Sequence, residues 1–332
     1  MIYSSLSEIA DKFEVFLFDA YGVFWNGGGF YKNSKEIMQK LVAEGKTVVV
    51  VSNATLLHDD IVASYQRKNL LEGRDYTFMI SSGEVLRFDL SRKKISFSGN
   101  KFYTIGARHE KMFAGTMYKP VENLDEADFV FCGVPFLTAE DIAKYPQYKN
   151  CFLPAKTDEK GNIVFWDSTI AEPFEKIVNE VSKLKLPALN ANPDYLAQEG
   201  HPLAKEKAPQ FVVRNGTIAE MLRQCDNKVI EYGKPHTNIY DYVFAKLQKI
   251  GRMTDKAKIC MVGDTVWTDI KGAVNSGIVP ILCVQTGVTA LELSKGNTVK
   301  NLCESENIDV QQIIEIFVNF SITKMKKMRL FA

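Results

Sequence analysis

The chain has 332 residues, of which 46% are hydrophobic and 24% are charged. A typical length of about 150 residues per domain predicts two packed domains, and the ordinary composition excludes a long disordered region, a collagen-like repeat and a coiled coil. The 41 basic and 40 acidic residues leave a net charge of +1. The charge balance therefore favours neither nucleic acid nor a membrane surface as a partner.

The N-terminal stretch from Met1 to Glu14 has no basic flank followed by an apolar segment. No window of the sequence approaches the roughly 20 apolar residues that span a bilayer. We therefore expect a cytoplasmic protein that does not insert into a membrane. The six cysteines are scattered and form no Cys-x-x-Cys pair, which predicts reduced thiols and no zinc site.

The first part of the chain has the pattern of a strand, a helix and a second strand. Val15–Phe18 and Thr47–Val51 are apolar runs, as expected of parallel strands that are buried on both faces. Between them, apolar residues recur at helical spacing from Ile37 to Val42. Asp19 follows the first strand and Ser52 follows the second. This order is typical of a doubly wound α/β sheet.

The middle of the chain carries enough apolar pattern for a core of its own. Strands are predicted at Phe102–Ile105, Phe129–Phe131 and Ile163–Phe165, and apolar residues from Phe174 to Leu184 recur at helical spacing. We interpret this segment as a domain inserted into the first one.

The last third of the chain returns to the pattern of the first. Ile259–Val262 predicts a buried strand that leads to Asp264, Ile270–Gly277 predicts a helix, and Ile281–Val284 predicts another strand. The predicted fold class is α/β, with a Rossmann-like, doubly wound parallel sheet and an inserted α/β domain. The sheet domain is expected at residues 1–75 and 226–332, and the inserted domain at residues 76–225.

Polar side chains follow several of the predicted strands. An open parallel sheet binds ligands at the carboxyl ends of its strands, which is where Asp19, Ser52 and Asp264 are expected to lie. Lys234 stands just before a helix that we expect to begin at Pro235. Two ionised carboxylates repel each other, and Mg²⁺, which prefers hard oxygen ligands, would hold both. Any one of these residues alone is more often a turn cap or a solvated side chain, so their joint occurrence is what predicts a site.

Four segments resemble, in order, the motifs of the haloacid dehalogenase superfamily of hydrolases. They are Phe18-Asp19-Ala20-Tyr21-Gly22-Val23, Val51-Ser52-Asn53, Gly233-Lys234-Pro235, and Gly263-Asp264-Thr265 with Thr268-Asp269. The long insertion after the second motif resembles the class IIA branch, in which an α/β cap domain lies at that point. Three short stretches are also similar to that branch: Ser81–Glu84, Asn192–Asp194 and Gln285–Val288. The resemblance covers nearly the whole chain.

The resemblance implies a nucleophile and a metal site. Asp19 would attack phosphorus and form an aspartyl-phosphate, which divides one difficult displacement into two easier ones. Mg²⁺ would be held by Asp19, by the backbone carbonyl of Tyr21 and by Asp264, with Asp269 in support through water or indirect contacts.

The resemblance also implies a phosphate site and a class of substrate. Lys234 would neutralise charge on the transferring phosphoryl group, while Ser52 and Asn53 would bind its other oxygens. The expected substrate is a small phosphorylated metabolite, and the expected enzyme is a Mg²⁺-dependent phosphatase, a phosphoric monoester hydrolase. Class IIA caps often mediate dimers, so the resemblance allows for a homodimer.

Tyr21 departs from the pattern of the family's phosphatases, which carry a second Asp two residues after the nucleophile. A phenol can donate a proton to the leaving group but is a poor base at neutral pH, so hydrolysis is expected to be slow. Two alternatives stay open: a catalytically weakened protein that binds a phosphate ligand or a partner, and a metal-independent 2-haloacid dehalogenase. The segment Asp19-Ala20-Tyr21-Gly22 resembles the nucleophile motif of those dehalogenases. Those enzymes, however, carry their cap between the first two motifs, and they do not need the acidic pair of the fourth motif, which is Asp264 and Asp269 here.

Overall fold

The computed structural model describes residues 1–107, 110–199 and 210–316. Its contacts divide the chain into two compact units. The core unit comprises Met1–Ser52, His58–Ile80 and the chain from Lys234 onward, and the cap unit comprises Asn53–Leu57 and Ser81–Gly233. The domain limits expected from the sequence, after residues 75 and 225, stay a prediction, because a division by contacts does not test independent folding.

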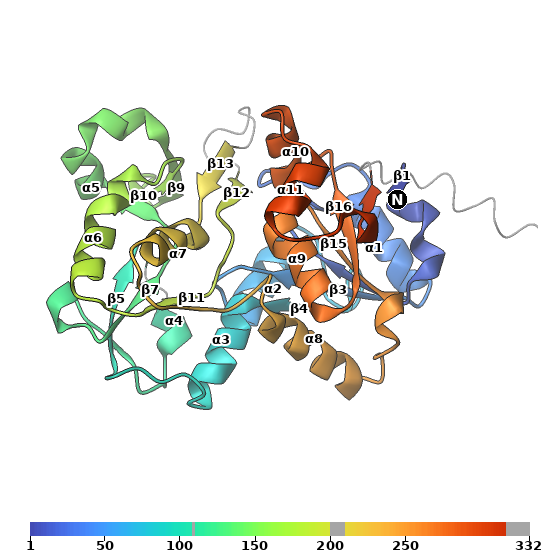
Figure 1. The fold of residues 1–332 in the computed structure, drawn as a ribbon, viewed down its shortest axis with the longest axis horizontal. Helices are drawn as coiled ribbons and strands as arrows, with labels where there is room; N and C mark the ends of the chain where they lie inside the picture. Colours follow the sequence, from blue (N-terminus) through green and yellow to red (C-terminus); the bar gives the residue numbers. More distant parts are fainter. Residues whose placement is uncertain (108–109, 200–209, 317–332) are drawn as a thin grey trace, which may run out of the picture. The chain divides into compact units, whose positions relative to one another are not determined.

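A seven-stranded sheet forms the centre of the core unit (Figure 1). Its strands, in spatial order, are β1 (Ile2–Tyr3), β17 (Ile314–Ile316), β16 (Val279–Cys283), β15 (Ile259–Gly263), β2 (Val15–Phe18), β3 (Thr47–Ser52) and β4 (Phe78–Ser81). The pairings from β1 through to β3 are parallel. Every residue of β2, β3 and β15 is buried, as the apolar runs predicted.

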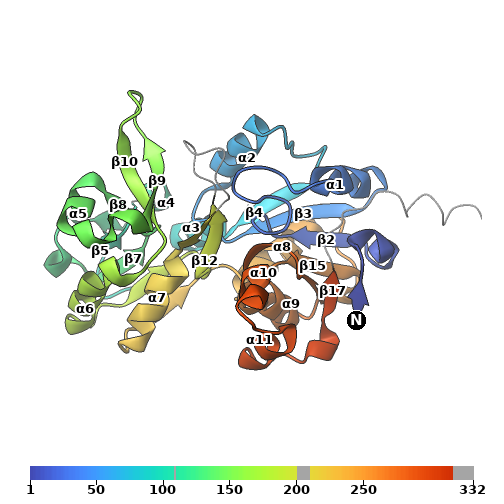
Figure 2. The same ribbon diagram turned by 90° about the horizontal axis from the view of Figure 1, so that it is seen from above.

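Helices lie on both faces of this sheet (Figure 2). The helices α1 (Ser34–Ala43) and α2 (His58–Arg67) lie on one face, and α8 (Thr237–Lys249) and α9 (Lys271–Ser276) lie on the other, where these two pack together. The remaining core helices are α10 (Gly287–Ser294) and α11 (Val299–Ser305). The predicted start of a helix at Pro235 is wrong, since α8 begins at Thr237, and a π-helical turn at Val266–Ile270 precedes α9.

The cap unit has a parallel sheet of its own. The strand order is β14 (Val229–Glu231), β11 (Ala188–Asn190), β7 (Phe129–Cys132), β5 (Lys101–Ile105) and β6 (Lys119–Pro120), and all of these pairings are parallel. The cap helices are α3 (Ser82–Ser91), α4 (Glu110–Phe113), α5 (Ala139–Lys144), α6 (Glu175–Lys183) and α7 (Asn215–Gln224). Apolar side chains from β7, α6 and α7 form one buried cluster, so the cap unit contains an apolar core.

Two antiparallel elements complete the cap. One is a three-stranded sheet in the order β8 (Phe136–Thr138), β10 (Ile163–Ser168) and β9 (Phe152–Thr157). The other is the pair β12 (Leu196–Glu199) and β13 (Gln210–Val213). Among the helices that the structure describes in either unit, none is long and apolar enough to cross a membrane.

Candidate active site

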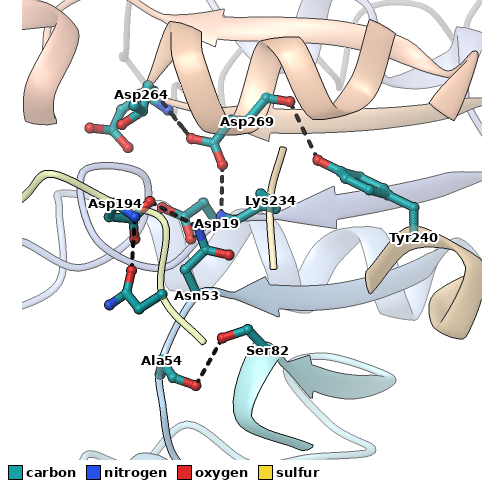
Figure 3. Close-up of polar contacts among 11 residues, drawn as sticks. Asp19, Asn53, Ala54, Ser82, Asp194, Lys234, Tyr240, Asp264 and Asp269 are labelled. Carbon is teal, nitrogen blue, oxygen red and sulfur yellow. Dashed lines mark hydrogen bonds and ion pairs between the residues drawn. The ribbon is translucent and has the colours of Figure 1, made fainter. Parts of the chain in front are cut away.

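The carboxyl ends of β2 and β15 bring two of the predicted aspartates together. These neighbouring strands pair Phe18 with Val262, and the backbone N–H of Asp19 continues the ladder by donating to the Val262 carbonyl at 3.0 Å. Asp19 and Asp264 therefore leave the sheet at the same edge. One carboxylate oxygen of each, together with one from Asp269, lies within a group whose members are at most 4.8 Å apart. Figure 3 shows the three carboxylates around Lys234.

Lys234 connects two of these carboxylates. Its Nζ lies 2.7 Å from Oδ1 of Asp19 and 2.7 Å from Oδ1 of Asp269. The side chains of Lys234 and Asp269 are each only 1% exposed, and that of Asp19 is 16% exposed. A buried ammonium needs charged partners in place of water. Lys234 thus fixes one oxygen of Asp19 and leaves the other, Oδ2, without a hydrogen bond among the described residues.

Asp269 shapes the loop that follows β15. Its Oδ2 accepts hydrogen bonds from the backbone N–H groups of Asp264 and Thr265, both at 3.1 Å, while its Oδ1 accepts from Lys234. It stands on the π-helical turn Val266–Ile270, which turns its carboxylate back toward the strand end. The side chain therefore orients the residues around Asp264 and is poorly placed to give both oxygens to a ligand.

Asp264 is held by the beginning of α10. Its Oδ2 accepts a hydrogen bond from the Val288 backbone N–H at 2.6 Å. Two glycines with positive φ, Gly22 at +78° and Gly287 at +61°, lie against the carboxylate. A Cβ at Gly22 would stand 2.3 Å from the carboxyl carbon of Asp264, and one at Gly287 would stand 1.8 Å from its Oδ2. Only glycine fits at either position.

The charges of this group fit a divalent cation. Burial is the main cause that raises the pKa of the Asp264 carboxyl well above its ordinary value, and the nearby Asp269 and Asp19 carboxylates raise it further. Three carboxylates and one ammonium leave two negative charges, which a divalent cation would balance. Carboxylate oxygens of Asp19 and Asp264 are hard donors of the kind that Mg²⁺ prefers.

The other predicted residues lie at the following places. Ser52 ends β3 and is buried, and Tyr21 is half-buried two residues after Asp19. The side-chain amide of Asn53 donates to Oδ1 of Asp194 at 2.9 Å within the cap unit. The functional roles of all these residues stay predictions. Asn53 has a partner that the sequence did not suggest, because 141 residues separate the pair.

Sequence reasoning assigned no role to Gly287 or to its neighbour Thr286, although both lie in a stretch that resembled class IIA. The Thr286 hydroxyl donates to the Gly22 carbonyl, so the loop after β2 is joined to the start of α10. Tyr31 was also missed. Its phenol accepts a hydrogen bond from the Gly287 N–H, and burial, with the Asp264 charge, raises its pKa well above the ordinary value. The sequence signal that could have identified this position was Gly287 itself, because a glycine within a motif indicates a position of positive φ or of close backbone approach.

Two family models match separate parts of the chain. The haloacid dehalogenase-like hydrolase model matches residues 16–116, and the HAD-hydrolase-like model matches residues 231–304. The matched segments contain the strand ends that carry Asp19 and Asp264. The chain belongs to the haloacid dehalogenase-like hydrolases.

Individual relatives extend the similarity over nearly the whole chain. Phosphoglycolate phosphatase 2 of Arabidopsis thaliana is 25% identical over 320 residues, which are 90% of this chain and 91% of the relative. A haloacid dehalogenase-like hydrolase from Brucella suis 1330 shares the fold with a TM-score of 0.69 and 22% identity, covering 95% of this chain and 98% of that one. The p-nitrophenyl phosphatase from Archaeoglobus fulgidus has a TM-score of 0.57 and 17% identity over 93% of this chain and 97% of that one.

Proposed function

We propose that this protein is a Mg²⁺-dependent phosphatase that hydrolyses a small phosphate monoester through Asp19. The observation that carries the proposal is the state of the Asp19 carboxylate. Its Oδ1 is held 2.7 Å from the buried ammonium of Lys234, which fixes the carboxylate in place, while Oδ2 carries no hydrogen bond from the described residues. A carboxylate with one oxygen fixed and the other available is suited to nucleophilic attack.

In the first step, Oδ2 of Asp19 attacks phosphorus and the bond to the leaving oxygen breaks. Lys234 offsets negative charge beside the reacting group, and Asp269 holds that ammonium in place from its other side. When bound, Mg²⁺ supplies further charge neutralisation on the phosphoryl oxygens. The leaving oxygen takes its proton from the Tyr21 phenol, which occupies the position of the family's acid.

In the second step, a water molecule attacks phosphorus of the aspartyl-phosphate, releasing phosphate and the Asp19 carboxylate. The proton lost by this water needs a base. Once solvent has returned a proton to the Tyr21 phenol, the phenol cannot accept this one. The proton then passes to bulk water or to the phosphate oxygens, so we expect this step to be slow.

The similarity to phosphoglycolate phosphatase 2 and to a p-nitrophenyl phosphatase supports a small phosphorylated substrate, in contrast to a polymer. The pairing of homodimer subunits through the cap and a cytoplasmic location stay proposals of the same kind.

The test uses p-nitrophenyl phosphate, whose leaving group departs without a proton donor. A slow second step predicts a rapid burst of about one nitrophenolate per enzyme, followed by a slow steady state, with both phases dependent on Mg²⁺. Borohydride reduction of acid-quenched enzyme should convert residue 19 to homoserine, because an acyl phosphate is reducible and a carboxylate is not. Asp19→Asn should abolish the burst, while Asp241→Asn, a change on the exposed face of α8, should leave it unchanged.

Turnover that survives Asp19→Asn would contradict the mechanism. Mg²⁺-dependent stabilisation by phosphate ligands without turnover would favour the binding protein, and metal-free release of chloride from a 2-haloacid would favour the dehalogenase.

A further inference from the structure

The backbone N–H groups in the first turn of α10 donate hydrogen bonds to other groups of the protein. The Gly287 N–H donates to the Tyr31 phenol, the Val288 N–H to Oδ2 of Asp264 at 2.6 Å, and the Thr289 N–H to the backbone carbonyl of Asp264 at 3.0 Å. These are donors that a helix leaves unpaired at its start. Because these N–H groups are already bonded, the start of α10 holds Asp264 in place and does not form an anion-binding site.

Asp264 lies in a slot between two stretches of backbone. Gly287 forms one wall and Gly22 the other, and a single methyl group on either would overlap the carboxylate. The slot and the Val288 N–H together fix the carboxylate plane. Oδ2 is turned toward α10, so Oδ1 is the oxygen left for a ligand.

Thr286 joins the two walls. Its hydroxyl donates to the Gly22 carbonyl, and the Gly22 N–H donates in turn to the Trp25 carbonyl at 2.9 Å. The Gly22 loop follows directly after Asp19, whereas Thr286 leads into α10. The Thr286 hydroxyl therefore connects the segment that carries Asp19 to the segment that orients the Asp264 carboxylate.

We infer that Thr286 is a positioning residue for the metal ion, because it holds the Gly22 wall against Asp264 and so keeps the Asp264 and Asp19 oxygens at the spacing that a divalent cation needs. The inference rests on the proposed function. Thr286 itself bonds to a backbone carbonyl and acts on the carboxylates through the loop. Without its hydroxyl, the wall is free to move away and the Asp264 carboxylate can rotate, which lowers the affinity for the metal.

The experiment measures metal binding by substrate-free protein. Mn²⁺ is titrated into the full chain, its free-ion electron paramagnetic resonance signal is followed as it disappears on binding, and Mg²⁺ is then added as competitor. Thr286→Val should raise the dissociation constants of both ions by about tenfold, the usual size of an effect from a group that orients a metal ligand. Thr286→Ser retains the hydroxyl and should bind within about twofold of the unmodified protein.

Thr254→Val is the matched control. It also removes a threonine hydroxyl with a single acceptor, since Thr254 donates to the Glu14 carboxylate at 2.7 Å, in the loop before β15. Circular dichroism of each variant verifies folding. Tight binding by the unmodified protein with equal binding by Thr286→Val would overturn the inference and leave the proposed function intact. Absence of Mn²⁺ and Mg²⁺ binding in the unmodified protein would overturn both.

Discussion

Replacing Lys234 with methionine tests how strongly the core unit depends on its buried ion pairs. Lys234 and Asp269 are each 1% exposed, and the ammonium contacts two carboxylates at 2.7 Å. Removing one partner of a buried pair leaves an uncompensated charge and costs about 3–5 kcal/mol. With a urea slope of about 2 kcal/mol per molar, a loss of about 4 kcal/mol lowers the unfolding midpoint by about 2 M.

The assay is urea unfolding in buffer with EDTA, followed by circular dichroism. Lys258→Met is the matched control, because the Lys258 Nζ lies 2.6 Å from Glu14 but both side chains are about half exposed. An exposed pair contributes little, so its loss should leave the midpoint almost unchanged. Equal midpoints for the two variants would refute the claim that burial makes the Lys234 pairs important. Phosphatase activity should be lost in Lys234→Met alone.

Three further predictions concern the site and the buried phenols. Gly287→Ala should lose metal binding and activity. Gly296→Ala is the control, because Gly296 also has positive φ but has no atom within 4 Å of the new Cβ, so this variant should lose only about 1 kcal/mol of stability. Equal activity in the two variants would contradict the claim that only glycine fits beside the Asp264 carboxylate. Tyr21→Asp should speed the second chemical step by about 10²-fold or more and remove the nitrophenolate burst, and a slower steady state would show that the phenol has a positive role. Burial raises the pKa of Tyr65 and Tyr240 well above the ordinary value. The folded state therefore keeps protons that the unfolded state loses above about pH 10, so the free energy of unfolding should fall as pH rises beyond that point. A free energy of unfolding that stays constant above about pH 10 would contradict this.

The sequence was sufficient to predict the strands that build the core. A strand buried on both faces must be apolar throughout, and Val15–Phe18 and Ile259–Val262 satisfy that local requirement. Since parallel strands end at a common edge, the positions of Asp19 and Asp264 followed from the same pattern. Lys234 could be named, but its two partners could not, because no local pattern encodes a bond between residues 215 positions apart.

The sequence could not show how the site is held together. Thr286 and Gly22 are 264 residues apart, and neither lies in a periodic apolar pattern that would link them. The direction of the Asn53 amide toward Asp194 likewise depends on how two loops meet in space. The start of α8 was misplaced because proline at position 235 satisfies the rule for a first helical residue, whereas the backbone becomes helical only at Thr237.

The pairing of β2 with β15 has a consequence for synthesis of the chain. Val15 pairs with Ile259, which leaves the ribosome 244 residues later. At about 5–20 residues per second, the N-terminal strands wait roughly 10 to 50 s for that neighbour. All of the cap segment Ser81–Gly233 emerges within this interval. Throughout it, β2 presents an apolar strand with one edge unpaired, which is the state in which a nascent chain is most exposed to aggregation.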